Sequence, residues 1–216
     1  WMTECGRGNV DLPQDAETTP FNVPQEFLID GYEYEEDIRN FDTKHLSYVE
    51  INNKPFKEFK SFLDSLDVEK KSWSLDLQTF KDEKAWYDFH INGASAYFLL
   101  YKNEIIGLIN GYMITYMSED PLNLKQFEIS FVVKNRYQGN GLGTQLLLIL
   151  ERELENKVLY TEGNECVIKT LVAKHYKDNI ASHKAFIKAG WMNAKVVVDD
   201  KHHDQRGELV FKMKEI

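Results

Sequence analysis

A six-residue loop between an apolar strand and an apolar helix constrains this chain most. Gln138–Gly143 reads QGNGLG and has glycine at alternate positions. Before it, Phe127–Val133 is a run of β-branched and aromatic residues of strand length. After it, the apolar segment Leu146–Leu150 leads into charged residues, a composition typical of an amphipathic helix. The predicted order is strand, glycine loop, helix.

This order predicts a binding site for an anion. Glycines allow the backbone to turn sharply and approach a ligand, and the free N–H groups of the first helical turn lie at the positive end of the helix dipole. Phosphate is the anion most often bound there. A tight turn without a ligand is the alternative, and glycine spacing by itself leaves it open.

Three kinds of phosphate loop fit the order to different degrees. A nucleoside triphosphatase loop ends in Gly-Lys-Ser/Thr, and Gly143-Thr144-Gln145 excludes it. A dinucleotide loop requires G-x-G-x-x-G, but Thr144 occupies the place of its last glycine. Its acidic residue would be Glu162, which is not at a clear strand end, so this interpretation is disfavoured.

The third interpretation is a resemblance to a known family. Gln138, Gly141 and Gly143, after a strand that contains Glu128, resemble the acetyl-CoA pyrophosphate loop of the GNAT superfamily of N-acetyltransferases. Asn179–Trp191 is similar to the superfamily's second motif, with Asn, a Ser three residues on, an aromatic residue seven on, and a closing Gly-aromatic pair. The two motifs, with the strands around them, extend the resemblance over the last three quarters of the chain.

The resemblance implies an α+β fold of the α/β sandwich type. Its sheet would be mixed, mostly antiparallel, flanked by helices and splayed at the acetyl-CoA site. Residues 1–43 hold three of five prolines and an acidic stretch and are expected to form an extension, partly ordered, before a domain at 44–216. Within the domain we expect strands at 46–51, 94–101, 105–116, 127–133, 167–173, 194–198 and 209–213, and helices over 56–66, 74–89, 146–150 and 180–189.

Composition and charge narrow the class of protein. The 216 residues suffice for one buried core, and no apolar run approaches the roughly 18 residues of a membrane span. The chain shows no secretion signal, so we expect a cytoplasmic location. Cys5 and Cys166 are expected to be unrelated reduced thiols, and His202-His203-Asp204 lacks the spacing of a metal site, so no metal is expected.

The formal net charge of -9 argues against nucleic acid as a partner and favours a cationic acceptor. We expect a small-molecule or protein amine, without membrane binding. A polyamine, an aminoglycoside, a protein amine and an amino sugar all stay open, as does the oligomeric state, dimer included. The resemblance also makes Trp86, Tyr87 and Phe89 candidates to line the acceptor site, with core packing as the alternative.

The co-substrate that the resemblance implies is acetyl-CoA. Backbone N–H groups of Gly139–Thr144 would hold the pyrophosphate, and the backbone of Phe131–Val133 would pair with the pantetheine like an added strand. The N–H of Val133 would face the thioester oxygen. Asn179 and Ser182 would bind CoA by hydrogen bonds. The full predicted set is Phe131, Val132, Val133, Gln138, Gly139, Asn140, Gly141, Leu142, Gly143, Thr144, Asn179 and Ser182.

Glu128 is the predicted general base. A carboxylate in an apolar strand is costly unless it faces a cleft or finds a partner, and its place resembles that of the catalytic glutamate of the histone acetyltransferase branch. A structural glutamate at a strand end is the alternative. Phe186 stands where many members have a tyrosine as general acid, so His175 or Tyr176 would have to substitute.

Two functions follow from these residues. The first is transfer of an acetyl group from acetyl-CoA to a primary amine, by direct attack in a ternary complex with Glu128 as base. The alternative is a catalytically inactive acyl-CoA-binding sensor or interaction module.

Overall fold

One mixed sheet organises the computed structural model of the protein, which describes residues 19–20, 43–67, 80–92, 95–114, 126–155, 159–161, 164–166, 168, 170–176, 178–198 and 208–215. Within them the sheet has eight strands in the order β1-β2-β3-β4-β5-β8-β10-β9, and β6 pairs separately with β7. Neighbouring strands of the sheet are antiparallel except β5 and β8, which are parallel. The expected α+β class with a mixed, mostly antiparallel sheet is confirmed.

The elements, in chain order, have the following bounds. The strands are β1 Thr19–Pro20, β2 Leu46–Glu50, β3 Ser95–Tyr101, β4 Glu104–Ile114, β5 Gln126–Val133, β6 Leu159–Thr161, β7 Asn164–Cys166, β8 Thr170–Tyr176, β9 Met192–Val198 and β10 Glu208–Glu215. The helices are α1 Phe56–Asp64, α3 Glu83–Asn92, α4 Leu142–Glu155 and α5 Ile180–Lys188, with 3-10 turns η3 Thr43–His45, η4 Ile51–Asn53 and η6 Asn135–Tyr137.

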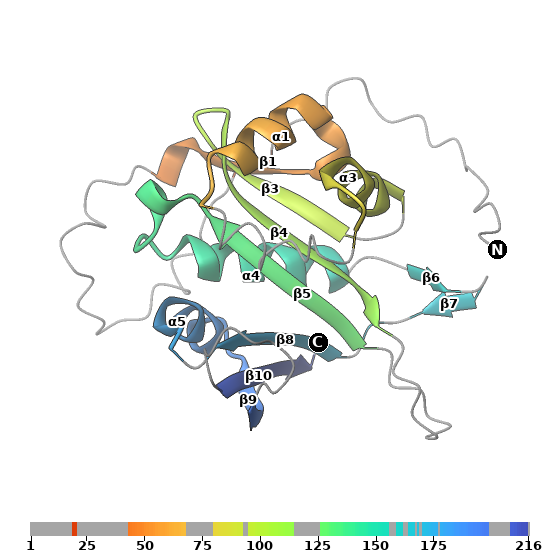
Figure 1. Cartoon of the computed structure of the whole chain (residues 1–216), viewed down its shortest axis with the longest axis vertical. Coiled ribbons are helices and arrows are strands. Elements are labelled where there is room, and N and C mark those ends of the chain that lie inside the picture. Colours follow the sequence, from red (N-terminus) through yellow and green to blue (C-terminus); the bar gives the residue numbers. More distant parts are fainter. Residues whose placement is uncertain are drawn as a thin grey trace.

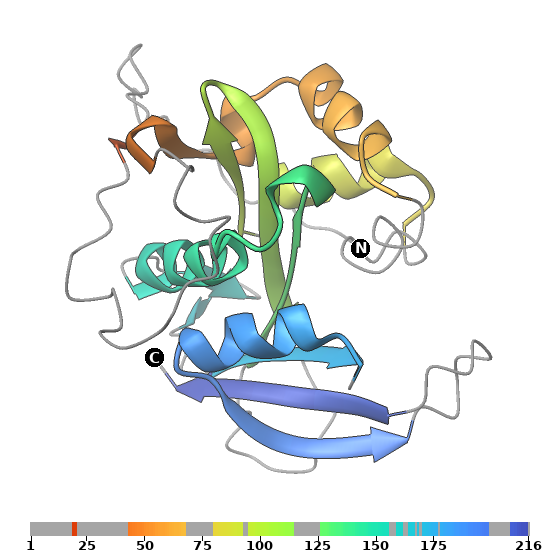
Figure 2. The same cartoon turned by 90° about the vertical axis from the view of Figure 1, so that its left-hand side faces the viewer.

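Helices cover both faces of the sheet. In Figures 1 and 2, α1 and α3 lie on one side of β3 to β5, and α4 lies on the other. The central strand β3 reads SAYFLLY, and its first six residues are buried, because an apolar run without alternation fits a strand that is covered on both faces. The sheet therefore has two separate apolar layers.

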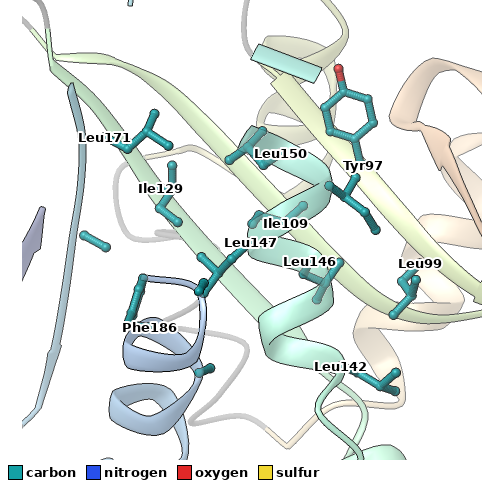
Figure 3. Packing of buried hydrophobic residues seen from close by; sticks show 14 of the residues in the cluster. Tyr97, Leu99, Ile109, Ile129, Leu142, Leu146, Leu147, Leu150, Leu171 and Phe186 are labelled. Carbon is teal, nitrogen blue, oxygen red and sulfur yellow. The ribbon is translucent and has the colours of Figure 1, made fainter. Parts of the chain in front are cut away.

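The two layers are built differently. On one face, Phe59 of α1 stacks on Trp86 of α3 with ring centroids 5.2 Å apart, and both rings are fully buried. On the other face, Leu146, Leu147 and Leu150 of α4 pack against the strands, as Figure 3 shows. Leucines three and four residues apart form one stripe along a helix, so α4 turns that stripe to the sheet.

The sheet opens between β5 and β8. In these two fully described strands the parallel ladder has three pairs, from Gln126↔Thr170 to Glu128↔Val172. Beyond Glu128 the strands part, and Figure 2 shows β8, β10 and β9 lying across the direction of β3 to β5. The predicted splay is confirmed at this position.

Most predicted elements agree with the structure, and three differ from it in their bounds. The helix expected over 74–89 begins at Glu83 and continues to Asn92, while residues 74–79 lie outside the described part. The strand expected at 167–173 is β8, three residues further on. The glycine-loop helix also starts earlier, at Leu142, so that Gly143 belongs to its first turn. Residues 115–125, 199–207 and most of 1–42 lie outside the described part.

Candidate acetyl-CoA and acceptor site

The glycine loop has backbone angles that require glycine. Gly139 and Gly141 have φ of 85° and 71°, in the left-handed region that residues with a side chain rarely adopt. A Cβ atom added at either would meet nothing within 4 Å, so both faces are open for a ligand to approach. Gly143 differs, because a Cβ there would lie 2.9 Å from Phe131 and 3.3 Å from Ala185. This third glycine allows α4 to pack closely against β5 and α5.

The first turn of α4 offers backbone donors beside this loop. The N–H of Gln145 donates to the Gly141 carbonyl at 3.2 Å, and the N–H groups of Leu142, Gly143 and Thr144 precede it in the turn. The first N–H groups of a helix have no acceptor within the helix and attract anions. Open glycine faces and helical donors together fit a pyrophosphate.

The polar side chains of the loop hold its shape. Gln138 Nε2 donates to the Val133 carbonyl at 2.8 Å, and Asn140 Nδ2 donates to the Tyr137 carbonyl at 3.1 Å. Both residues were expected to bind CoA. These bonds direct both side-chain amides to the loop itself. The backbone of this segment is therefore left to make the contacts expected with the ligand.

The backbone edge of β5 faces the opening between β5 and β8. The N–H of Lys134 donates to Ile106 of β4 at 2.9 Å. Successive N–H groups of a strand point to opposite sides, so those of Val133 and Phe131 point away from β4. The Val133 carbonyl, which accepts from Gln138, points the same way. This edge can accept an added extended chain, the role expected of Phe131, Val132 and Val133.

Aromatic rings close the opening on the α4 side. Phe131 of β5 contacts Phe186 of α5 edge to face at 5.6 Å, and His175 of β8 stacks on Phe186 at 5.8 Å. Phe186 also packs on Trp191, and it is buried. Its ring is therefore part of the core that joins α5 to both strands.

Of the two residues considered as a substitute general acid, His175 does not fit that role, and the role of Tyr176 stays a prediction. His175 Nδ1 lies 2.7 Å from the carbonyl oxygen of Tyr176, so Nδ1 carries the ring proton. Burial lowers the pKa of His175, although the bond to that carbonyl opposes the shift, and the ring is neutral near pH 7. Its Nε2, buried and without a hydrogen-bond partner, has no proton to donate. Tyr176 is buried as well.

Glu128 lies where the β5 and β8 ladder ends. It is half-buried, and its Oε1 is 3.1 Å from the Lys174 ammonium of β8. The carboxylate therefore has a partner, and its role as general base stays a prediction. Tyr112 of β4 lies directly opposite Glu128, and the ring of Phe89, from α3, is 6.2 Å from that of Tyr112.

Further side chains lie around Glu128 on the face of the sheet that α1 and α3 cover. We call the group Phe89, Tyr112, Glu128, Ser130 and Lys174 the acceptor face. Phe89 is 40% exposed, whereas Trp86 and Tyr87 are buried. Of the three aromatic residues considered for the acceptor site, Phe89 belongs to this surface and the other two belong to the core.

A buried polar chain behind the acceptor face was missed by sequence reasoning. Ser130 Oγ donates to Asn110 Oδ1 at 2.9 Å, and Asn110 Nδ2 lies 3.3 Å from His90 Nε2. The available signal was Asn110 itself, a polar residue inside the apolar strand expected at 105–116, which must find a partner when buried.

The second motif forms the start of α5. Asn179 is the N-cap of this helix, and its side-chain oxygen accepts from the N–H of Ser182 at 3.1 Å. Gly190, with φ of 81°, ends the helix, and the N–H of Trp191 donates to the Phe186 carbonyl. The spacing of the motif is thus that of a short capped helix, and the predicted contacts of Asn179 and Ser182 with CoA stay predictions.

The basic residues before the glycine loop are paired. Lys134 Nζ lies 2.9 Å from Glu104 Oε1, and Arg136 Nη2 and the Tyr137 hydroxyl also donate to this carboxylate. Burial acts to raise the pKa of Glu104, but the hydrogen bonds from Lys134 and Tyr137 and the positive charges of Lys134 and Arg136 together outweigh burial, and the pKa is lowered. The carboxylate is therefore charged at pH 7 and fixes η6.

Two further observations concern metal sites and membrane-spanning helices. Across the described residues, no group of three His, Cys, Asp or Glu side chains could hold a metal ion. Among the helices that the structure describes, none combines the length and the hydropathy needed to cross a membrane.

This combination of splayed sheet, glycine loop and capped second helix defines an acetyltransferase fold of the GNAT type. The profile of the acetyltransferase (GNAT) family matches residues 58–191. The match covers more than half of the chain, and the chain belongs to this family. A search for sequence relatives among curated proteins finds no match.

Solved structures show the same fold at low sequence identity. The chain is similar to a GNAT-family acetyltransferase from Streptococcus pneumoniae, with TM-score 0.59, 16% identity and coverage of 79% of this chain and 99% of that one. A ribosomal-protein-alanine N-acetyltransferase from Brucella melitensis gives TM-score 0.59 and 14% identity, with 78% and 99% covered. AAC(6')-Ib in complex with ribostamycin and coenzyme A gives 0.54 and 14%, with 79% and 93% covered.

Proposed function

We propose that this protein transfers an acetyl group from acetyl-CoA to a primary amine by direct attack in a ternary complex. One observation carries the proposal: Glu128 lies at the last pair of the β5 and β8 ladder, on the strand that continues into the open edge and the glycine loop. A base, a strand-like binding edge and an anion site are thus linked within one strand–loop–helix unit.

The residues have distinct roles in this proposal. Acetyl-CoA supplies, when bound, a thioester whose carbonyl carbon bonds to the amine nitrogen while the carbon–sulfur bond breaks. Glu128 accepts a proton from the acceptor ammonium, directly or through water. The N–H of Val133, which points to the opening, donates to the thioester oxygen. Because His175 and Phe186 offer no proton, Tyr176 or water protonates the departing thiolate, and the nitrogen gives its second proton to water as the amide forms.

The acceptor is proposed to be a small-molecule or protein amine that carries positive charge. The net charge of -9 and the carboxylate at the acceptor face favour a cation. Among the similar structures, one is a complex with the aminoglycoside ribostamycin and others are ribosomal-protein N-acetyltransferases, which supports amines as the class of acceptor. Neither nucleic acid nor a metal enters the proposal.

Two measurements test this function. Acetyl-CoA and CoA, at about 100 times their dissociation constants, should stabilise the purified protein by roughly 2.7 kcal/mol, and NAD should not. Thiol release from acetyl-CoA with a panel of primary amines should then fall by about 10² in Glu128→Gln, without loss of CoA affinity. Glu50→Gln on β2 is the matched control and should retain turnover. Stabilisation by CoA without turnover of any amine would instead support an inactive acyl-CoA-binding module.

A further inference from the structure

A chain of polar side chains connects α3 to the strand that carries Glu128. His90, in the last turn of α3, and Asn110, on β4, are each 2% exposed. Asn110 lies 3.3 Å from His90 Nε2 through its nitrogen and accepts from Ser130 Oγ through its oxygen at 2.9 Å. Because buried polar groups are costly when a hydrogen bond is not made, the donors and acceptors along this chain must run in one consistent direction.

The direction is set at the helix. His90 Nδ1 lies 2.9 Å from the carbonyl oxygen of Trp86, which can only accept, so Nδ1 carries the proton. Burial lowers the pKa of His90 to about 4, although the bond to Trp86 opposes the shift, and the ring is neutral at pH 7. Its Nε2 is therefore an acceptor for the amide nitrogen of Asn110. The amide oxygen then faces Ser130, whose hydroxyl proton is used in that bond.

The hydroxyl oxygen lies on the acceptor face. Ser130 is half-buried and two residues from Glu128, so both side chains project from the same face of β5, roughly 6.5 Å apart along the strand. The β5 and β8 ladder ends at Glu128, which places Ser130 beside the opening. This face therefore presents a carboxylate and a hydroxyl oxygen, both of them hydrogen-bond acceptors.

We propose that Ser130 positions the acceptor amine by accepting a hydrogen bond from its nitrogen, and that His90, acting through Asn110, holds the hydroxyl in this polarity. The inference rests on the proposed acetyl transfer and deepens it. A hydroxyl that donated to the amine would occupy the nitrogen lone pair. A hydroxyl that accepts an N–H leaves the lone pair for attack, while Glu128 takes the proton.

Kinetics of the 216-residue chain test the role of Ser130. With the amine that the wild type uses best, Ser130→Ala should lower kcat/KM for the amine on the order of 10- to 100-fold, since a misplaced nucleophile loses that much. The KM for acetyl-CoA should stay within about twofold. Ser130→Thr keeps the hydroxyl and should restore most of the activity, and Ser47→Ala on β2 is the matched control. Activity of Ser130→Ala within about twofold of wild type would overturn the inference while leaving the acetyl transfer intact.

Spectroscopy of the wild type tests the polarity without any acceptor. Long-range 1H–15N spectra at pH 7 distinguish a protonated from a bare ring nitrogen, and the His90 signal is assigned by its absence in His90→Phe. We expect a proton on Nδ1 and none on Nε2. A proton on Nε2 would overturn the proposed direction of the chain. Failure of the wild type to turn over any amine would overturn the proposed function, and with it the role of Ser130, even if the expected tautomer were found.

Discussion

The Glu128 carboxylate and the Lys174 ammonium join β5 and β8 at the point where the two strands part, with Oε1 and Nζ 3.1 Å apart. The side chain of Lys174 is 46% exposed and that of Glu128 is 20% exposed, so water reaches the pair. A partly exposed ion pair contributes at most about 1 kcal/mol to stability. The pair has a larger effect on the binding of other cations to the Glu128 carboxylate.

A cationic acceptor has to compete with Lys174 for Glu128. In Lys174→Met we therefore expect the KM of a cationic amine to fall about threefold to tenfold, equivalent to roughly 1 kcal/mol. Steady-state kinetics with amines of different charge measures this. Lys84→Met, which breaks the exposed pair of Lys84 with Asp88 on α3, is the matched control and should leave the KM unchanged. An unchanged or higher KM in Lys174→Met would mean that the acceptor does not approach Glu128.

The positive φ of Gly141 should matter for co-substrate binding. Alanine in the left-handed region costs roughly 1 to 2 kcal/mol, so Gly141→Ala should raise the Kd of acetyl-CoA about tenfold as the loop shifts. Gly190→Ala is the matched control, because Gly190 has a similar φ of 81° but lies at the far end of α5. Calorimetric titration should show weakened binding in the first variant and wild-type affinity, with lower stability, in the second. Equal affinities in both would exclude the loop from the binding site.

Phe186→Tyr restores the residue that many family members have, and we expect no gain in kcat. The ring is buried against Phe131, His175 and Trp191, so the added hydroxyl enters the core. A buried hydroxyl without a good partner costs about 1 to 3 kcal/mol, which urea unfolding measures. A severalfold rise in kcat would contradict this and place the hydroxyl within reach of the thiolate.

Buried neutral histidines should make stability depend on pH. The pKa of His90 is lowered to about 4 from its ordinary value of 6.5, so between these values the unfolded chain binds a proton that the folded chain does not. Stability is therefore retained above pH 6.5 and falls as the pH is lowered, by up to about 1.4 kcal/mol per pH unit for this residue. His175, whose pKa is also lowered by burial, acts in the same direction.

Urea unfolding between about pH 5 and the ordinary histidine pKa of 6.5 measures this slope above the range in which carboxyl groups titrate. We expect the unfolding free energy of His90→Phe to depend less steeply on pH than that of wild type, and the difference in slope should correspond to about one bound proton. The remaining slope is due to His175 and other histidines. The same slope in both proteins would show that His90 titrates normally in the folded state.

Local sequence signals were enough to predict the strand–loop–helix unit. A run of β-branched and aromatic residues of strand length identifies β5, and glycines at positions of left-handed backbone identify the loop, because these properties depend on residues close in sequence. The same holds for the β3–β4 hairpin, whose turn residues Lys102 and Asn103 have φ of 50° and 66°. Asn179 and Gly190 likewise mark the ends of α5 locally.

Contacts between distant residues were not predictable in this way. The strand expected at 167–173 is β8, three residues further on, because β10 pairs with it as far as Tyr176↔Leu209 and the stack on Phe186 buries His175. Sequence alone suggests that Lys174 and His175 end an apolar strand. The hydrogen bonds of Asn110 to residues 20 positions away on either side depend equally on strand register and on where α3 lies.

The three-pair ladder between β5 and β8 has a consequence for how the protein unfolds. The strands β8, β10 and β9 with α5 join the rest of the sheet through this short ladder, the Glu128–Lys174 pair and the packing of α5 on α4 and Phe131. The Glu151 carboxylate of α4 adds two links, because it accepts hydrogen bonds from Trp191 Nε1 and Lys214 Nζ. Such a unit can open below the global unfolding free energy. A pantetheine chain lying along β5 would cross-link the two parts, so acetyl-CoA should merge two cooperative units into one and slow amide hydrogen exchange in β8 as strongly as in β5.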